Sequence, residues 1–78
     1  MKFVWHFIAE FERSKAEHEV GDGPSAGRIF GAKAALEARV KDLRSEIPKM
    51  TGSVRDMEIL AELAYFNTWV SQKSLERM

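Results

Sequence analysis

The chain has 78 residues, no cysteine, and twelve basic residues balanced by twelve acidic ones. A chain of this length builds one core, so residues 1–78 are expected to form a single domain. The lack of cysteine excludes disulfides and thiolate metal sites, and the balanced charge disfavours a phosphate backbone as the main partner.

The first predicted element is a helix over residues 2–20. At 100° per residue, one side of this helix collects five apolar residues: Phe3, Val4, Phe7, Ile8 and Phe11. Aromatic residues also alternate along residues 3–11, and this pattern is typical of a strand. The helix is favoured because no turn signal separates this stretch from the strong helix formers that follow. An α+β fold with residues 3–11 as a strand remains the alternative.

The second predicted element is a helix over residues 25–47, after the glycine- and proline-rich segment 21–27. Its apolar side chains form one narrow stripe at spacings of three and four: Ile29, Ala32, Leu36, Val40, Leu43 and Ile47. Pro48 is expected to end the helix, because the residue before a proline disfavours the helical conformation.

The third predicted element is a helix over residues 53–76. Ser53 and Asp56 have the spacing of a capping box, with Asp in place of the usual Glu or Gln. One apolar face contains Ile59, Leu63, Phe66 and Val70, and a second contains Val54, Met57, Leu60, Ala61 and Ala64. Tyr65 and Trp69 widen the second face. A helix that is apolar on two sides is either central in a bundle or half of an interface.

These patterns predict an all-α three-helix bundle that dimerisation would complete. The small residues of the second face suit packing inside the protomer, and the first face suits a partner, which an identical chain would supply in a homodimer. The predicted partner-binding residues are Ile59, Leu63, Phe66, Val70, Tyr65 and Trp69.

No residue pattern indicates an enzyme, a cofactor or a metal site. His6 and His18 are twelve residues apart with no further histidine, which falls short of a zinc signature. There is no nucleophile elbow and no phosphate-binding loop, and the carboxylates lie among lysines and arginines, where structural pairing is their ordinary role.

One segment resembles the start of a DNA-binding helix-turn-helix motif, namely Leu60-Ala61-Glu62-Leu63-Ala64. The turn glycine expected four residues after the alanine at position 64 is absent, with Thr68 in its place, and too few residues follow for a recognition helix. Nucleic acid is therefore disfavoured as a partner. A small helical DNA-binding transcriptional regulator is kept as the alternative function.

The function favoured by the sequence is a non-enzymatic protein–protein interaction module, a stand-alone inhibitor or adaptor. Phage-encoded inhibitors of host defence systems, such as anti-CRISPR proteins, are one example of this size, although no residue singles that group out. No apolar run approaches the ~20 residues that cross a bilayer, so a membrane location is not expected. The expected location is the cytoplasm. The sequence does not identify the protein partner.

Overall fold

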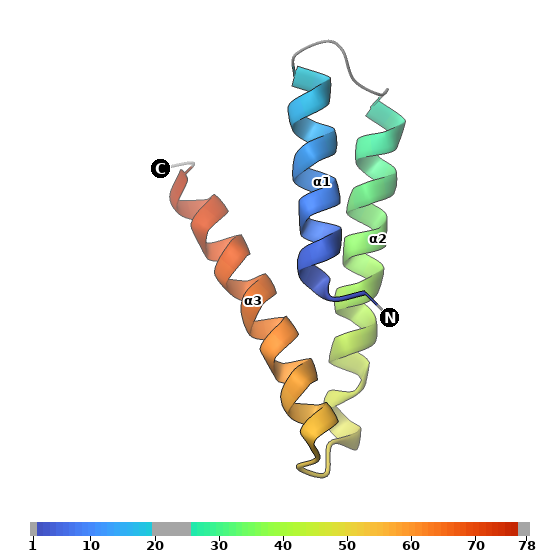
Figure 1. Cartoon of the computed structure of the whole chain (residues 1–78), viewed down its shortest axis with the longest axis vertical. Helices are drawn as coiled ribbons and strands as arrows, with labels where there is room; N and C mark the ends of the chain where they lie inside the picture. Colours follow the sequence, from blue (N-terminus) through green and yellow to red (C-terminus); the bar gives the residue numbers. More distant parts are fainter. Residues whose placement is uncertain (1, 20–25, 77–78) are drawn as a thin grey trace.

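A computed structural model describes residues 2–19 and 26–76 of the chain and shows an all-α fold (Figure 1). The elements are the helices α1 (Val4–Glu19), α2 (Ala26–Ser45) and α3 (Val54–Glu76), with a 3₁₀ turn, η1 (Ile47–Lys49), between the last two. The predicted three-helix fold is confirmed. The predicted helix end at residue 20 and the predicted helix start at residue 25 lie outside the described residues.

The strand alternative for residues 3–11 is wrong. Residues 4–11 lie within α1. Phe7 and Ile8, although adjacent in the chain, both pack at the core, as Val4 does one turn earlier, whereas Trp5 is 53% exposed. Burial therefore follows the period of 3.6 residues that places positions four apart on one face, and not the alternation of a strand.

Helix α2 ends at Ser45, before the predicted end at residue 47. Pro48 lies within η1, whose bonds run from the amide of Lys49 to the carbonyl of Glu46 (3.0 Å) and from that of Met50 to Ile47 (3.2 Å). Because Pro48 has no amide hydrogen to donate to the carbonyl four residues earlier, the α-helical bonds cannot continue through it, and the chain changes to i→i−3 bonds from the Glu46 amide onward. Ile47 is consequently 47% exposed, and the expectation that it completes the apolar stripe is wrong.

The start of α3 is a capping box, as predicted. The amide of Asp56 donates to Ser53 Oγ (3.2 Å), and the Asp56 carboxylate accepts from the Ser53 amide (3.1 Å). The same carboxylate also accepts from the amides of Thr51 (2.7 Å) and Gly52 (2.8 Å), and Gly52 has a φ of 87° that favours glycine. The bond from the Thr51 amide, together with those from Ser53 and Gly52, lowers the pKa of Asp56.

The three helices contact one another, but not along their whole lengths (Figure 1). Helices α1 and α2 lie antiparallel, while α3 approaches them at its start and diverges from them toward the C-terminus. The core consists of seven aliphatic residues: Val4, Ile8, Leu36, Val40, Leu43, Ile59 and Leu63. Phe7, Met50, Phe66 and Trp69 pack against it and are partly buried.

The divergence of α3 makes the molecule open. Its extents are 47 × 28 × 15 Å, and its radius of gyration of 14.4 Å exceeds the roughly 11.5 Å of a compact domain of 78 residues. Its accessible surface is 5725 Å², whereas a compact monomer of 8.9 kDa has about 4,800 Å². The chain therefore exposes about 900 Å² more than its mass requires.

Candidate protein-binding surfaces on the third helix

The inner face of the first half of α3 belongs to the core of the chain. Ile59 and Leu63, two of the predicted partner-binding residues, are only 6% and 7% exposed and lie in the cluster that contains Leu43. Large aliphatic side chains gain most from burial, so this face turns toward α1 and α2 and not toward a partner. The two residues are therefore not available at the surface of the chain.

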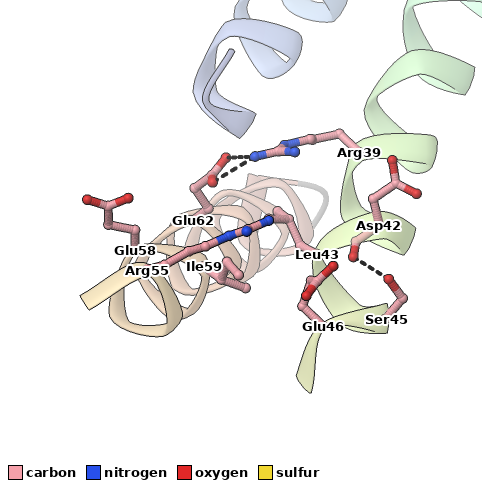
Figure 2. A pocket seen from close by; sticks show the side chains of 9 residues that line it. All are labelled: Arg39, Asp42, Leu43, Ser45, Glu46, Arg55, Glu58, Ile59 and Glu62. Atoms are coloured by element: carbon pink, nitrogen blue, oxygen red, sulfur yellow. Dashed lines mark hydrogen bonds and ion pairs between the residues drawn. The ribbon is translucent and has the colours of Figure 1, made fainter. Parts of the chain in front are cut away.

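A buried carboxylate joins all three helices where α3 and α2 meet. Glu62 is 6% exposed, and its Oε1 accepts a hydrogen bond from the amide of Val4 (2.8 Å) at the start of α1. Arg39 of α2 donates to both oxygens of Glu62, at 2.9 and 3.2 Å (Figure 2). The carboxylate thus satisfies a free amide at a helix N-terminus, where the helix dipole also favours negative charge.

Glu62 was not among the predicted site residues. The available signal was its position, three residues after Ile59 and four before Phe66, which places a carboxylate inside the inward stripe of α3. A carboxylate at such a position needs a buried donor, and the sequence does not show that Arg39 and the start of α1 converge there.

The hollow beside this ion pair is polar. It measures about 550 Å³ and is lined by two arginines and four carboxylates, above Leu43 and Ile59: Arg39, Arg55, Asp42, Glu46, Glu58 and Glu62. Figure 2 shows Glu58 pointing away from the Arg39–Glu62 pair. Among the described residues, no group of three His, Cys, Asp or Glu side chains could hold a metal ion.

The second half of α3 is attached to α1 by one cluster of side chains. The indole Nε1 of Trp69 donates to Glu12 Oε1 (2.9 Å), and Lys73 Nζ lies 3.0 Å from the same oxygen. The Trp69 ring packs edge-on against Phe11, with centroids 6.1 Å apart, and lies 6.0 Å from the ring of Phe66. This cluster holds the diverging half of α3 near α1.

The charges of this cluster stabilise each other. Burial acts to raise the pKa of Glu12, but the hydrogen bonds from Lys73 and Trp69 outweigh it, and the pKa is lowered. The hydrogen bond to Glu12 in turn raises the pKa of Lys73. Both shifts favour the charged forms, as expected for a pair that stays in contact with water.

Three of the six predicted partner-binding residues line a groove next to this cluster. Phe66, Trp69 and Val70 form one wall, Phe11 and Leu36 continue the apolar lining, and the groove measures about 270 Å³. The groove is also lined by Lys15, Lys33 and Lys73. The structure thus brings Phe66, Trp69 and Val70 together and separates them from Tyr65, which is 54% exposed on the other side of α3.

The outer face of α3 is apolar and uncovered. Leu60, Ala61 and Ala64, which were expected to pack inside the protomer, are exposed, so the inner and outer faces are the reverse of those expected. Val54 and Met57 on this face are 74% and 66% exposed. Ile59 and Leu63 turn toward the core. The stripe that contains Val54 and Met57 lies on nearly the opposite side of the helix, so it faces away from α1 and α2.

The outer face has the spacing of a coiled-coil seam. Its central residues recur at intervals of four and three, and all are exposed: Met57, Ala61, Ala64, Thr68, Ser71 and Leu75. A strict alternation of three and four residues is the pattern by which two helices pack side by side. None of the six is charged, which is unusual for a solvated stripe of a helix.

Comparison of the chain with protein-family models, with curated proteins and with solved structures found no match. Among the described residues, no helix combines the length and the apolar character needed to cross a membrane.

Proposed function

We propose that the protein is a non-enzymatic protein–protein interaction module, an inhibitor or adaptor, and that it works as a homodimer joined through the outer face of α3. The observation that carries this proposal is the excess of about 900 Å² of accessible surface over a compact monomer. A stable interface takes about 800 Å² from each partner, and the excess, summed over the whole molecule, is of that order.

The residues that make up the exposed surface support protein binding. Among residues 2–19 and 26–76, ten large apolar side chains are at least 40% exposed, whereas seven form the core. Five of the ten lie on the outer side of α3: Val54, Met57, Leu60, Tyr65 and Leu75. Exposed large apolar side chains gathered on one side of a helix are typical of an interaction site.

A second copy of α3 fits this face in an antiparallel orientation. With the helices centred on residue 66, Met57 lies opposite Leu75 of the second copy, and Ala61 lies opposite Ser71. Ala64 then lies opposite Thr68, so large residues meet large ones at the two ends and small ones meet in the middle. This register is two-fold symmetric, as a closed dimer requires, and opposed helix dipoles favour it.

The composition of the seam suits this pairing. Small side chains at Ala61, Ala64 and Ser71 allow the two backbones to approach closely, and no charge has to be removed from water. The Thr68 hydroxyl donates to the carbonyl of Ala64 within α3, so this polar group of the seam already has an acceptor in the helix.

Light scattering and sedimentation equilibrium test the dimer. Wild type is expected to dimerise, and Ala64→Glu to be monomeric with unchanged helix content, because it places two carboxylates at the centre of the seam. Ala38→Glu is the matched control, since Ala38 is also an exposed helical alanine but lies on α2. A wild-type monomer at all concentrations, or a dimeric Ala64→Glu, would contradict the proposal.

Engineered cysteines test the register, because the chain has none of its own. A mixture of Met57→Cys and Leu75→Cys chains is expected to form a mixed disulfide efficiently, whereas either variant alone is not. Efficient cross-linking of each variant with itself would indicate a parallel dimer and overturn the antiparallel register.

No observation favours the DNA-binding alternative. Helix α3 runs without interruption from Val54 to Glu76, so the segment that resembles the start of a helix-turn-helix is not followed by a turn at Thr68. The proposed inhibitor or adaptor, with phage-encoded inhibitors of host defence as one example, needs only a surface that another protein can occupy.

A further inference from the structure

The groove beside Trp69 is the middle part of a longer channel. It shares Phe11, Lys15 and Lys33 with a hollow of about 300 Å³ that extends toward the start of α2. It shares Glu37 and Phe66 with a hollow of about 240 Å³ that extends toward Arg44. The three hollows therefore follow one side of α2.

The channel has an apolar floor. Side chains from all three helices contribute to it: Phe11, Ile29, Leu36, Val40, Phe66 and Val70. Along α2 it extends from Ile29 to Arg44, a rise of about 22 Å, which is the length of a helix of about 15 residues.

The edges of the channel are basic although the chain as a whole is neutral. Its lining contains five lysines and arginines but only two glutamates: Lys15, Lys33, Lys41, Arg44 and Lys73, with Glu19 and Glu37. Lys73 is paired with Glu12 and Glu76. Lys33, Lys41 and Arg44 form no salt bridge with any residue that the structure describes. The hollow beside Glu62 has the opposite balance, with two arginines and four carboxylates.

We infer that this channel binds an acidic amphipathic helix of about four turns presented by a partner protein. An amphipathic helix lays its apolar side chains on an apolar floor at positions one turn apart, and its flanking carboxylates face the basic edges. The inference rests on the proposed role in protein binding, but it concerns a different surface from the dimer seam, because the channel lies on the inner side of α3.

Two other occupants fit the channel less well. A second copy of the chain would approach through the seam of α3, which carries no charge to complement the lysines. A nucleic acid backbone would face the basic edges but would leave the apolar floor against phosphates, and its binding depends on a larger surplus of positive charge.

A fluorescence titration with two matched peptides tests the inference. Trp5→Phe leaves Trp69, which lines the channel, as the reporter. The probes are blocked peptides of about 15 residues with leucines at helical spacing and glutamates elsewhere, or with lysines in place of the glutamates. The Leu/Glu peptide is expected to shift Trp69 emission and to bind at least about tenfold more tightly than the Leu/Lys peptide, by a margin that shrinks as salt is added. Equal affinities, or no binding of the Leu/Glu peptide, would overturn the inference.

Charge reversals locate the binding site. Exposed ion pairs are each worth roughly 1.5- to 5-fold in affinity, so the double variant Lys33→Glu/Arg44→Glu is expected to bind the Leu/Glu peptide about tenfold more weakly. Lys49→Glu, an exposed charge reversal in η1 away from the channel, is the matched control and should bind as wild type does. A double variant that binds as tightly as Lys49→Glu would overturn the inference.

Two further measurements distinguish peptide binding in the channel from binding at the dimer seam and from nucleic acid binding. Ala64→Glu should bind the peptide as wild type does, whether or not the chain dimerises, so failure of the dimer and failure of the channel are distinguishable. Weakened peptide binding by Ala64→Glu would move the site to the seam and contradict the inference. A mixed-sequence DNA duplex that displaces the peptide, and loses affinity in the double variant, would identify a nucleic acid site instead.

Discussion

The two halves of α3 show how one helix divides its surface between folding and binding. In the first half, Ile59, Glu62 and Leu63 are each less than 10% exposed, because the start of α1 and the end of α2 both lie against them. In the second half, the cluster around Trp69 holds the helix to α1, and Val70 is 40% exposed. Similar apolar side chains thus become core in one half and accessible surface in the other, depending on their neighbours.

The two halves of α3 are also held by ion pairs that differ in their exposure to water. The Arg39–Glu62 pair has side chains 15% and 7% exposed, so its members have lost most of their water and depend on each other. The Glu12 and Lys73 side chains remain 34% and 33% exposed, and water can replace either partner. Disruption of the first pair should therefore affect folding, and disruption of the second should affect mainly the position of the second half of α3.

The largest expected effect is that of Glu62→Ala. It leaves the Arg39 guanidinium and the Val4 amide buried without their carboxylate, and such a loss costs about 3–5 kcal/mol. This is a large part of the roughly 4–12 kcal/mol that stabilises a domain of this size. Urea unfolding followed by circular dichroism measures it. Glu58→Ala, an exposed carboxylate one turn earlier, should change the free energy of unfolding by less than about 0.5 kcal/mol. Equal effects of the two variants would contradict a joining role for Glu62.

The reversed faces of α3 predict a smaller contrast between two leucines. Leu63→Ala removes a core side chain and should destabilise the fold by about 2–5 kcal/mol, whereas Leu60→Ala should cost less than about 0.5 kcal/mol in the monomer. Both are best measured in the Ala64→Glu background, which excludes any contribution of the dimer seam to unfolding. A larger loss for Leu60→Ala than for Leu63→Ala would restore the original assignment of the faces.

The fold could be predicted from the sequence because local signals determine it. The apolar stripe of α2 and the capping box at Ser53 and Asp56 are set by residues within a few positions of one another. Pro48 likewise predicts an end of α2 close to its own position, although the helix already ends at Ser45. Such signals depend on backbone geometry that is the same in every protein.

The arrangement of the candidate surfaces could not be predicted in the same way. Helical periodicity shows that α3 has two apolar faces, but the face that turns inward depends on where α1 and α2 lie. The role of Glu62 depends on residues 58 and 23 positions away, Val4 and Arg39, and the joining of Trp69 to Glu12 spans 57 positions. Only the surplus of apolar surface on α3 was visible in the sequence itself.

The smallest expected effect comes from the diverging half and depends on pH. Because the pKa of Glu12 is lowered in the fold, its charged form contributes stability above its ordinary pKa, and this contribution disappears as the pH falls through the lowered value. Glu12→Gln should therefore be less stable than wild type at neutral pH, and the difference should disappear as the pH falls below the ordinary pKa of a glutamate. Asp56 titrates in the same direction, so acid weakens both sites.

Trp69 emission separates the two sites, because its indole donates to Glu12 and lies far along α3 from the cap at Asp56. In the Trp5→Phe background, acid should change Trp69 emission of the folded chain when Glu12 is present and leave it unchanged in Glu12→Gln. Asp56→Asn should keep the acid response of Trp69 while it lowers stability at neutral pH. An acid response that survives in Glu12→Gln would show that the Glu12 contact does not hold the second half of α3, and the contrast between the two halves would lose its electrostatic basis.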